Sequence, residues 1–347
     1  QADLAGSDDG FITQFTFQPN ASRYDIEYAT YFGGSANDRI DQLIASETDR
    51  FLISDTGDLF IAGHTASPAE DRDGLPDFPV KHALQPTEGG SQDVFLARLS
   101  RGGQELLFST YLGGSNDDFV TGFAMDDKQH YLLSGYTSSD DWPTRNALMP
   151  TYPEGSSSDM GTIAKVDRSG RFLHFSTYLG AAGDDRVLAI APIKRNLIDN
   201  VDGKIYVAGI TDSNAFPVKD AYQWFHSGDG DGFLATLGAS GRAINFSTYF
   251  GGSEIDEIVA VKPNRLSLMD SVIFAGHTDE EGSSVIFPTA VQPPISPHAG
   301  SRDTFVGRFD EINIGPRPPV LWLETDLEAM YPEAASAPKP FPVTFEL

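Results

Sequence analysis

The apolar residues of this chain fall into short runs, which are separated by polar turns rich in glycine. Phe, Tyr, Val, Ile and Thr dominate these runs, and the run at residues 93–99 opens on an Asp and is then mostly apolar. Short runs of β-branched and aromatic residues bounded by turn signals are typical of strands. No amphipathic stretch of helical period extends over more than a few turns. The pattern predicts an all-β protein.

One phrase occurs four times along the chain. Each copy contains an aromatic residue, a small residue, Thr, Tyr, an apolar residue and Gly, and the copies are residues 28–35, 108–115, 175–180 and 246–253. Their tyrosines, Tyr31, Tyr111, Tyr178 and Tyr249, are 80, 67 and 71 residues apart. A repeated unit of this size cannot bury its faces alone and has to stack on its neighbours. The sequence therefore predicts a repeat architecture with loops of variable length.

Each unit carries four strand signals, which we call strands a, b, c and d in chain order. Strand a follows the Gly-Gly turn, strand b ends in Gly-x-Thr, strand c opens on Asp, and strand d is the repeated phrase. The loop between strands b and c, here the b–c loop, carries an aromatic-Pro pair at Phe78-Pro79, Trp142-Pro143, Phe216-Pro217 and Phe287-Pro288. Four antiparallel strands per repeat are typical of a β-propeller blade. A tandem of sandwiches would need about 100 residues per module, which is more than one unit offers.

The strand signals do not divide evenly. Strand c occurs five times, because residues 9–15 are a further copy, whereas strands a, b and d occur four times. We therefore expect a ring closed by strands from both termini, with residues 24–32 in the same sheet as residues 258–261 and 271–277, because closure hides two sheet edges. Four blades are favoured, and five result if the half-units form separate blades. In the third unit, strand c at 163–166 lacks its Phe and is interpreted as shifted by one residue.

The combined motif resembles a known family. Phe-Ser-Thr-Tyr-Leu-Gly-Gly-Ser-x-x-Asp, then Gly-x-Thr, then Phe-Pro, then Asp-x-Phe-Leu-Ala-Arg-Leu is similar to the bacterial SBBP-type β-propeller repeat over about residues 9–310. This resemblance implies a large exported or surface protein of bacteria, and the family has no common enzymatic activity. The chain departs from the pattern at Gly180-Ala181-Ala182, which replaces Gly-Gly-Ser, and at the missing Phe near Asp159.

Composition and charge exclude several classes of partner and chemistry. The net charge is −26, from 50 acidic and 24 basic residues, and such a surface repels phosphate backbones, so nucleic acid is not expected as a partner. The chain has no cysteine, which excludes disulfides, thiolate metal sites and thiol catalysis. It has no apolar run long enough to insert into a membrane. Absent cysteine and a start at Gln1 without a signal peptide favour a processed, exported protein of the cell surface, periplasm or extracellular space.

Acidic residues supply the candidate sites. One acid follows each strand d in register, at Asp38, Asp118, Asp185 and Asp256. A ring of carboxylates could hold a cation, but an Asp in a Gly-rich turn also accepts backbone N–H bonds and ends the turn, a need that every blade shares. We therefore expect a structural role for these four.

Two loops partly match oxygen-ligand calcium loops. The better candidate contains Asp71, Asp73 and Asp77, but Ala69 stands where a first acid would be expected. The second contains Asp229 and Asp231, with no later acid to act as a bidentate ligand. Calcium needs six or more oxygen ligands, which neither loop supplies from side chains alone. Calcium is thus the one cofactor considered, and no other is expected.

The chain carries no nucleophile elbow, phosphate loop, dinucleotide fingerprint or zincin motif, so no catalytic residue is assigned and no enzyme is expected. The leading hypothesis is a structural or protein-interaction module of a cell-surface or extracellular assembly. One alternative is a carbohydrate-binding or adhesion module that uses the variable b–c loops. A second alternative is a propeller enzyme, such as a lyase or a glycosidase.

The pattern changes after residue 310. Residues 1–310 are expected to form the propeller, and residues 311–347 a Pro-rich extended tail. A tail of this length cannot build a core of its own. We expect it to contact a blade edge or another chain through the apolar anchors Val320, Trp322, Tyr331, Phe341 and Phe345.

Overall fold

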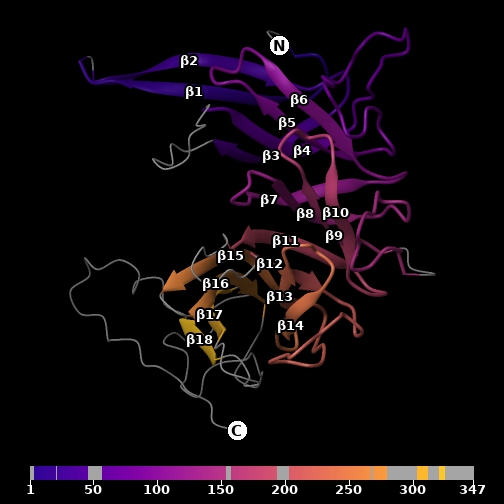
Figure 1. The fold of residues 1–347 in the computed structure, drawn as a ribbon, viewed down its shortest axis with the longest axis vertical. Coiled ribbons are helices and arrows are strands. Elements are labelled where there is room, and N and C mark those ends of the chain that lie inside the picture. Colours follow the sequence, from indigo (N-terminus) through magenta and orange to yellow (C-terminus); the bar gives the residue numbers. More distant parts are fainter. Residues whose placement is uncertain are drawn as a thin grey trace. The chain divides into compact units, whose positions relative to one another are not determined.

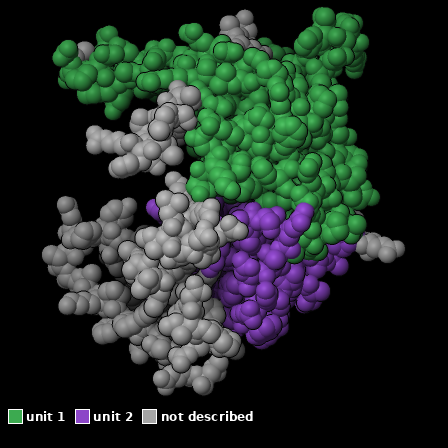
Figure 2. Space-filling model, viewed as in Figure 1, with its two compact units in different colours: residues 1–152, 162–178 green, residues 153–161, 179–347 purple. Residues whose placement is uncertain are grey.

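The structure is a computed structural model of the 347-residue chain. It describes residues 4–20, 22–45, 57–153, 158–193, 203–266, 269–279, 303–311 and 320–324. Within these ranges every named element is a β-strand (Figure 1). The chain divides into two compact units, the first made of residues 1–152 and 162–178 and the second of residues 153–161 and 179–347 (Figure 2). The all-β prediction is confirmed.

The first unit holds a two-stranded sheet and two four-stranded sheets. The first pairs β1 (Gly10–Gln18) with β2 (Arg23–Phe32). The second has the order β3 (Asp38–Ala45), β4 (Leu59–Thr65), β5 (Asp93–Leu99) and β6 (Leu106–Leu112). The third contains β7 (Asp118–Met125), β8 (Tyr131–Thr137), β9 (Met160–Val166) and β10 (Leu173–Leu179), again neighbours in chain order. Both four-stranded sheets follow the predicted order a, b, c, d.

The second unit repeats the same sheet twice. One copy contains β11 (Asp185–Pro192), β12 (Lys204–Thr211), β13 (Asp231–Gly238) and β14 (Ile244–Phe250). The other contains β15 (Asp256–Leu266), β16 (Met269–Thr278), β17 (Asp303–Glu311) and β18 (Val320–Glu324). The strand pairs of both sheets are antiparallel, as in a propeller blade.

The prediction about ring closure is wrong in its choice of strands. β2 pairs with β1 in the two-stranded sheet, and the fourth place in the last sheet, beside β17, is held by β18. No hydrogen-bonded sheet of the described residues joins strands from both ends of the chain. The repeat pattern does not indicate this pairing, because β18 lacks the Phe-Ser-Thr-Tyr phrase, and backbone hydrogen bonds can pair any extended segment with an open edge.

Close contact with strand a explains why the first residue of each Gly-x-Thr is glycine. Strand a carries a register shift opposite this Gly, and in the first full sheet the shift lies between Ile40 and Gln42. A Cβ added at Gly63 would lie 1.8 Å from the carbonyl oxygen of Arg39, and the equivalent glycines of β8, β12 and β16 are equally close to strand a. A β-bulge thus brings strand a onto the backbone of strand b, where only glycine fits.

Aromatic side chains of strand d and of the b–c loop form much of the core. Tyr111, Tyr178 and Phe216 are buried, as predicted, whereas Phe287 lies outside the described residues. The rings of Phe78 and Tyr111 have their centroids 5.2 Å apart, and those of Phe216 and Tyr249 6.0 Å apart. The b–c loop therefore covers the sheet from which it emerges, and its aromatic-Pro pair supplies the anchor.

The third copy of strand c is in register, which corrects the predicted one-residue shift. Met160 in β9 stands where β5 has Asp93, because a Cβ at Gly180 would meet Met160 Sδ and Asp185 Oδ2, just as one at Gly113 would meet Asp93 Oδ1 and Asp118 Oδ2. The chain has therefore replaced the first Asp of strand c by Met in this sheet.

The predicted tail belongs in part to the last sheet. Residues 320–324 are extended and pair antiparallel with β17, from Val306 to Asp310. The predicted anchors Tyr331, Phe341 and Phe345 lie outside the described residues. No described segment forms a helix with the length and apolarity that crossing a bilayer requires.

Candidate functional site

The two-stranded sheet is the point where the repeat is incomplete. By sequence, β1 is a copy of strand c and β2 a copy of strand d, and the pair forms the hairpin drawn in indigo in Figure 1. In the four-stranded sheets of the first unit, strand c has strand b on its other side. β1 has β2 as its only sheet partner among the described residues. We call the β1–β2 hairpin the half-blade.

One face of the half-blade is packed against the first full sheet. Ile12 and Phe32 are buried there, in a cluster with Phe78 and Phe95. The Phe32 ring lies 5.4 Å from that of Phe95 and 5.5 Å from that of Phe78, measured between centroids. This face fixes the position of the half-blade within the first unit.

The other face of the half-blade is apolar and exposed. Alternate side chains of a strand lie on the same face, which places Phe11, Phe15 and Phe17 together along β1. Phe15 is opposite Ile26 and Phe17 opposite Tyr24 in the hairpin, and the last two rings are 5.1 Å apart. All five of these large side chains are exposed. The half-blade therefore carries a group of exposed apolar side chains, which distinguishes it from surfaces where such residues are scattered singly.

Copies of the same strand elsewhere in the chain show that this exposure is not a property of the repeat. Phe11 is 73% exposed, whereas the residues at the same repeat position, Phe95, Phe233 and Phe305, are 0%, 0% and 2% exposed. The b–c loop covers two of these rings, since Phe78 lies 5.3 Å from Phe95 and Phe216 lies 4.5 Å from Phe233. Among the described residues, no b–c loop covers Phe11 in the way that Phe78 covers Phe95.

In the first three four-stranded sheets, the b–c loop pairs with the outer edge of strand d. Residues of that loop make β-bridges to the outer edge of strand d, at Lys81 with Ser109 and Gln85 with Tyr111. The third and fourth occurrences of the phrase have matching bridges, between Arg145 and Ser176, Met149 and Tyr178, Lys219 and Ser247, and Gln223 and Tyr249. The outer edge of β2 has no such bridge among the described residues.

The repeated tyrosine depends on the same loop. The hydroxyl of Tyr178 donates to the carbonyl oxygen of Ser139 at 2.9 Å and accepts from the backbone N–H of Trp142 at 2.9 Å. Tyr249 makes the equivalent bonds with Ser213 and Phe216. Tyr31 holds this position in the half-blade and is only partly buried.

The four predicted turn acids are all buried and form one motif. Each accepts a hydrogen bond from the backbone N–H four residues earlier, as Asp118 does from Gly114 at 2.7 Å; the other pairs are Asp38 with Gly34, Asp185 with Ala181, and Asp256 with Gly252. The Thr of Gly-x-Thr donates to the other oxygen of Asp38, Asp118 and Asp185, from Thr65, Thr137 and Thr211. These bonds tie the turn after strand d to the end of strand b, as expected of a structural acid.

Burial raises the pKa of three of these carboxyls, those of Asp38, Asp118 and Asp185. It raises the pKa of Asp118 to about 7, with hydrogen bonds from Thr137 and Gly114 opposing the rise and the nearby Asp93 adding to it. Burial also raises the pKa of Asp185 to about 6, and that of Asp38 above its usual value. A carboxyl taken out of water favours its neutral form, which is the physical cause in each case.

In both predicted calcium loops, carboxylate oxygens accept hydrogen bonds from neighbouring groups of the chain. Asp71 Oδ1 accepts backbone N–H bonds from Asp73 and Leu75, each at 2.9 Å, and Asp77 Oδ2 accepts from the hydroxyl of Ser35 at 2.5 Å. In the second loop Asp229 is exposed, whereas Asp231 is buried and accepts from Ser227 N–H and from Gln223 Nε2. No group of three or more acidic or histidine side chains suited to a metal occurs among the residues described.

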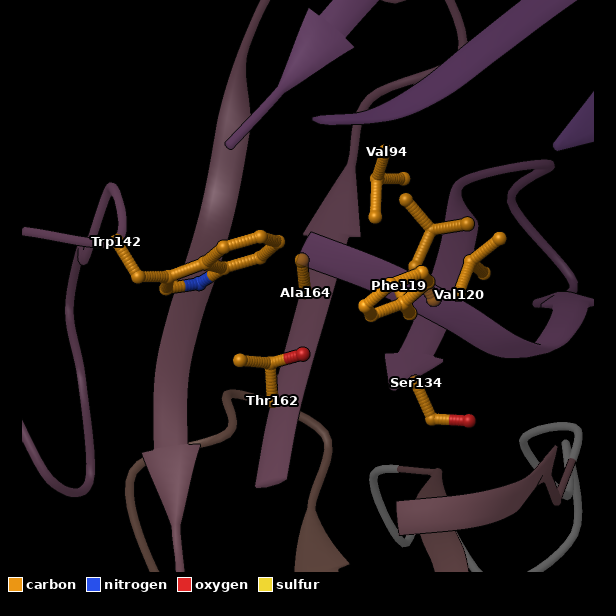
Figure 3. Close-up of a pocket in the computed structure, with 8 residues that line it drawn as sticks. Val94, Phe119, Val120, Ser134, Trp142, Thr162 and Ala164 are labelled. Atoms are coloured by element: carbon orange, nitrogen blue, oxygen red, sulfur yellow. The ribbon is translucent and has the colours of Figure 1, made fainter. Parts of the chain in front are cut away.

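A small pocket lies beside the strand c that lacks its Phe, and its lining includes Val94, Val120, Trp142 and Thr162. Thr162 stands at the position of Phe95, and the indole of Trp142 occupies part of the space, with its N–H donating to Ser176 Oγ at 2.8 Å. Figure 3 shows the indole on one side of Ala164 and the Phe119 ring on the other. The remaining volume is about 10 Å³, room for a single water molecule. It is a packing defect and too small for an organic ligand.

The exposed face of the half-blade was not predicted from the sequence. The available signal was the extra copy of strand c at residues 9–15, which the closure hypothesis assigned to the last blade. No protein-family model matches the chain, and no curated protein matches it either.

Proposed function

We propose that this protein is a non-catalytic, exported β-propeller of the SBBP-repeat type, which serves as a protein-interaction module in a cell-surface or extracellular assembly. The four-stranded sheets act as blades, and the half-blade is the binding surface. Repeated blade-like sheets, the acidic surface and the repeat motif support this proposal. A rigid scaffold that exposes one apolar face, here that of the half-blade, is suited to binding a polypeptide in a defined place.

The observation that carries the proposal is the exposure of Phe11 against the burial of its repeat equivalents. Burying a Phe side chain stabilises an association by about 1.5–3 kcal/mol. Phe15, Ile26 and Tyr24 extend the same apolar face. Beside it, the edge of β1 that does not face β2 is not paired with any described strand and can add an extended strand by β-augmentation.

Selection from a displayed peptide library on the immobilised protein tests this function. We expect wild-type protein to enrich peptides whose binding is lost in the Phe11→Ser/Phe15→Ser double variant. The matched control is Phe172→Ser, which removes an aromatic residue that is equally exposed at the turn before β10. Circular dichroism checks that all three proteins are folded. Enrichment that is the same on the double variant, or none at all, would contradict the proposal.

A second candidate function is carbohydrate binding through a b–c loop. Trp224 and Phe225 are adjacent in the loop before β13 and both are exposed, which is the arrangement that stacks on sugar rings. A glycan array with wild type and Trp224→Ala decides it. Binding that depends on Trp224 and survives the Phe11→Ser/Phe15→Ser change would favour this alternative over the half-blade.

A further inference from the structure

We propose that His130 and His174 form a binding site for a divalent transition-metal ion, such as Cu²⁺ or Zn²⁺. The site goes beyond the proposed function and does not involve the half-blade. Both histidines belong to the first unit, where they border the sheet of β7, β8, β9 and β10. Neutral imidazole is a ligand that suits copper, nickel and zinc, whereas calcium takes oxygen ligands.

The two imidazole rings lie side by side, although they are far apart in the sequence. His130 ends the turn between β7 and β8, and His174 is the second residue of β10. Their ring centroids are 4.2 Å apart, and the ring planes make an angle of 48°. Nitrogens of two rings this close can reach one ion, because a zinc–imidazole bond is about 2.0–2.1 Å long.

Asp126 holds the His130 ring in the form that can bind a metal. Its Oδ2 lies 3.0 Å from His130 Nδ1. Burial opposes ionisation of Asp126, but hydrogen bonds from Lys165 and His130 outweigh it and keep its pKa low, so the carboxylate only accepts. Nδ1 therefore carries the proton, and the lone pair on Nε2 is left for the metal. Metal-ligating histidines commonly have such a carboxylate partner, which fixes the ring and raises its basicity.

The carboxylate of Asp126 is itself fixed in place. Its Oδ1 accepts from the backbone N–H groups of Lys128 and His130, each at 2.9 Å. Its Oδ2 lies 2.7 Å from Lys165 Nζ, and both of these side chains are mostly buried. The turn between β7 and β8 thus presents His130 in a set orientation, and metal binding does not have to order it.

His174 is the accessible ligand of the pair. The residue is exposed, and its ring has no hydrogen-bond partner among the described residues. Partial burial lowers the pKa of His174, and the nearby His130 and Lys165 lower it further, so the ring is neutral at pH 7. A neutral, exposed imidazole can rotate toward an ion that His130 already holds.

The charges around the two rings favour a cation over an anion. Two carboxylates, Asp126 and Asp167, and one ammonium group, Lys165, act on His174, which leaves an excess of negative charge. The whole chain has a net charge of −26 and attracts cations as well. Two protein ligands leave coordination positions for water, as at a tetragonal Cu²⁺ ion. We therefore expect Cu²⁺ to bind more tightly than Zn²⁺, in line with the Irving–Williams order.

Metal titration of the full chain tests the site. Isothermal titration calorimetry with Cu²⁺, in a buffer that contains glycine as a competing ligand, should show a saturable site. His174→Ala should weaken that binding about tenfold or more, because the second of two chelating bonds forms intramolecularly. Zn²⁺ should raise the melting temperature of wild type but not that of His174→Ala. Ca²⁺ should not compete with either metal.

His82→Asn is the matched control. His82 is another exposed histidine, whose Nδ1 lies 3.3 Å from the carbonyl oxygen of Leu107. Its φ is 52°, a conformation that Asn tolerates. We expect this variant to bind Cu²⁺ as wild type does. Circular dichroism and urea unfolding of both variants check the fold, which substitution of the exposed His174 should leave unchanged.

Pulsed electron paramagnetic resonance of the bound Cu²⁺ counts its imidazole ligands. We expect two imidazoles in wild type and one in His174→Ala. Asp126→Asn should weaken Cu²⁺ binding about 10–100-fold with both imidazoles still coordinated, which identifies Asp126 as a positioning residue.

Three results would overturn the inference. They are an equal Cu²⁺ affinity of wild type and His174→Ala, a loss of affinity that His82→Asn shares, and a wild-type spectrum with fewer than two imidazoles. Peptide selection at Phe11 is an independent experiment, because Phe11 lies in β1 and the two histidines border another sheet. Failure of either experiment therefore leaves the other proposal standing.

Discussion

The carboxyl groups of Asp93 and Asp118 flank the backbone of Gly113 from two strands. A Cβ built on Gly113 would lie 1.8 Å from Asp93 Oδ1 and 2.6 Å from Asp118 Oδ2, so only glycine fits between them. Asp93 Oδ1 is buried and has no hydrogen-bond partner in the described part of the chain. Burial raises the pKa of Asp93 to about 6, with backbone bonds from Gly89 and Gly90 opposing the rise. The turn thus brings two carboxyls together at a place where ionising both is costly.

The first prediction concerns pH. Because the folded-state pKa values of Asp93 and Asp118 lie above the ordinary value, the folded protein binds these protons more tightly than the unfolded chain does. Their contribution to stability is therefore lost as pH rises through about 6 to 7, and it is gained as pH falls toward 5. Asp93→Asn should remove roughly 2 kcal/mol of this pH-dependent change. Urea unfolding at pH 5 to 8 measures it.

Two other buried carboxyls act in the same direction, because burial raises the pKa of Asp185 to about 6 and that of Asp38 above its usual value. Burial opposes ionisation of Asp126 and Asp167, but their hydrogen bonds outweigh it and hold both pKa values below the usual range. Those two groups therefore titrate well below pH 5. A wild-type stability that is flat or rising between pH 5 and 8 would contradict the prediction, as would an Asp93→Asn profile parallel to that of wild type.

The second prediction compares one tyrosine position in two settings. Tyr178→Phe should destabilise the protein by about 1–3 kcal/mol, because it leaves the buried carbonyl of Ser139 and N–H of Trp142 without their partner. Tyr31→Phe should change the free energy of unfolding by less than about 0.5 kcal/mol. If both variants lower the free energy of unfolding equally, the hydroxyl of Tyr31 has buried hydrogen-bond partners like those of Tyr178, which would contradict the prediction.

The third prediction tests the glycine of strand b. A Cβ at Gly135 would lie 1.9 Å from the carbonyl oxygen of Phe119, and backbone cannot move aside at low cost. Gly135→Ala should therefore lower the free energy of unfolding by about 2 kcal/mol or more. Gly238→Ala is the matched control, since its nearest neighbour is Asn245 Nδ2 at 4.0 Å. Thermal and urea unfolding of both variants decide whether the bulge imposes glycine.

The fourth prediction concerns β18. Deleting residues 316–347 removes the strand that pairs with β17, so the amides between Val306 and Asp310 should exchange faster with solvent. Amides of β5 and β6 in the first unit should keep their protection. Deleting residues 325–347 retains β18 and serves as the control. Unchanged exchange in β17 after the longer deletion would mean that β18 contributes nothing to the last sheet.

Periodicity alone was enough to predict most of the strands. Short apolar runs and Gly turns placed strands a to d because each strand is a local pattern repeated several times, as the copies ending at Thr65, Thr137 and Thr211 show. The burial of Tyr111 and Phe216 also followed from repetition, since a side chain that recurs in every unit meets the same neighbours in each. The turn acids Asp118 and Asp185 were predictable for the same reason.

Tertiary structure decided what happens where the repetition stops. Val320–Glu324 has no repeat motif and takes the fourth place in the last sheet, because a strand edge accepts backbone of any sequence. Phe11 carries the repeat motif and is nevertheless exposed. Its equivalent Phe95 is buried because other segments, including Phe78 of the b–c loop, cover its ring. Sequence thus determined which residues form strands and which side chains suit a core. Which edges and faces find a partner is decided by long-range pairing, and among the described residues that pairing leaves Phe11 exposed.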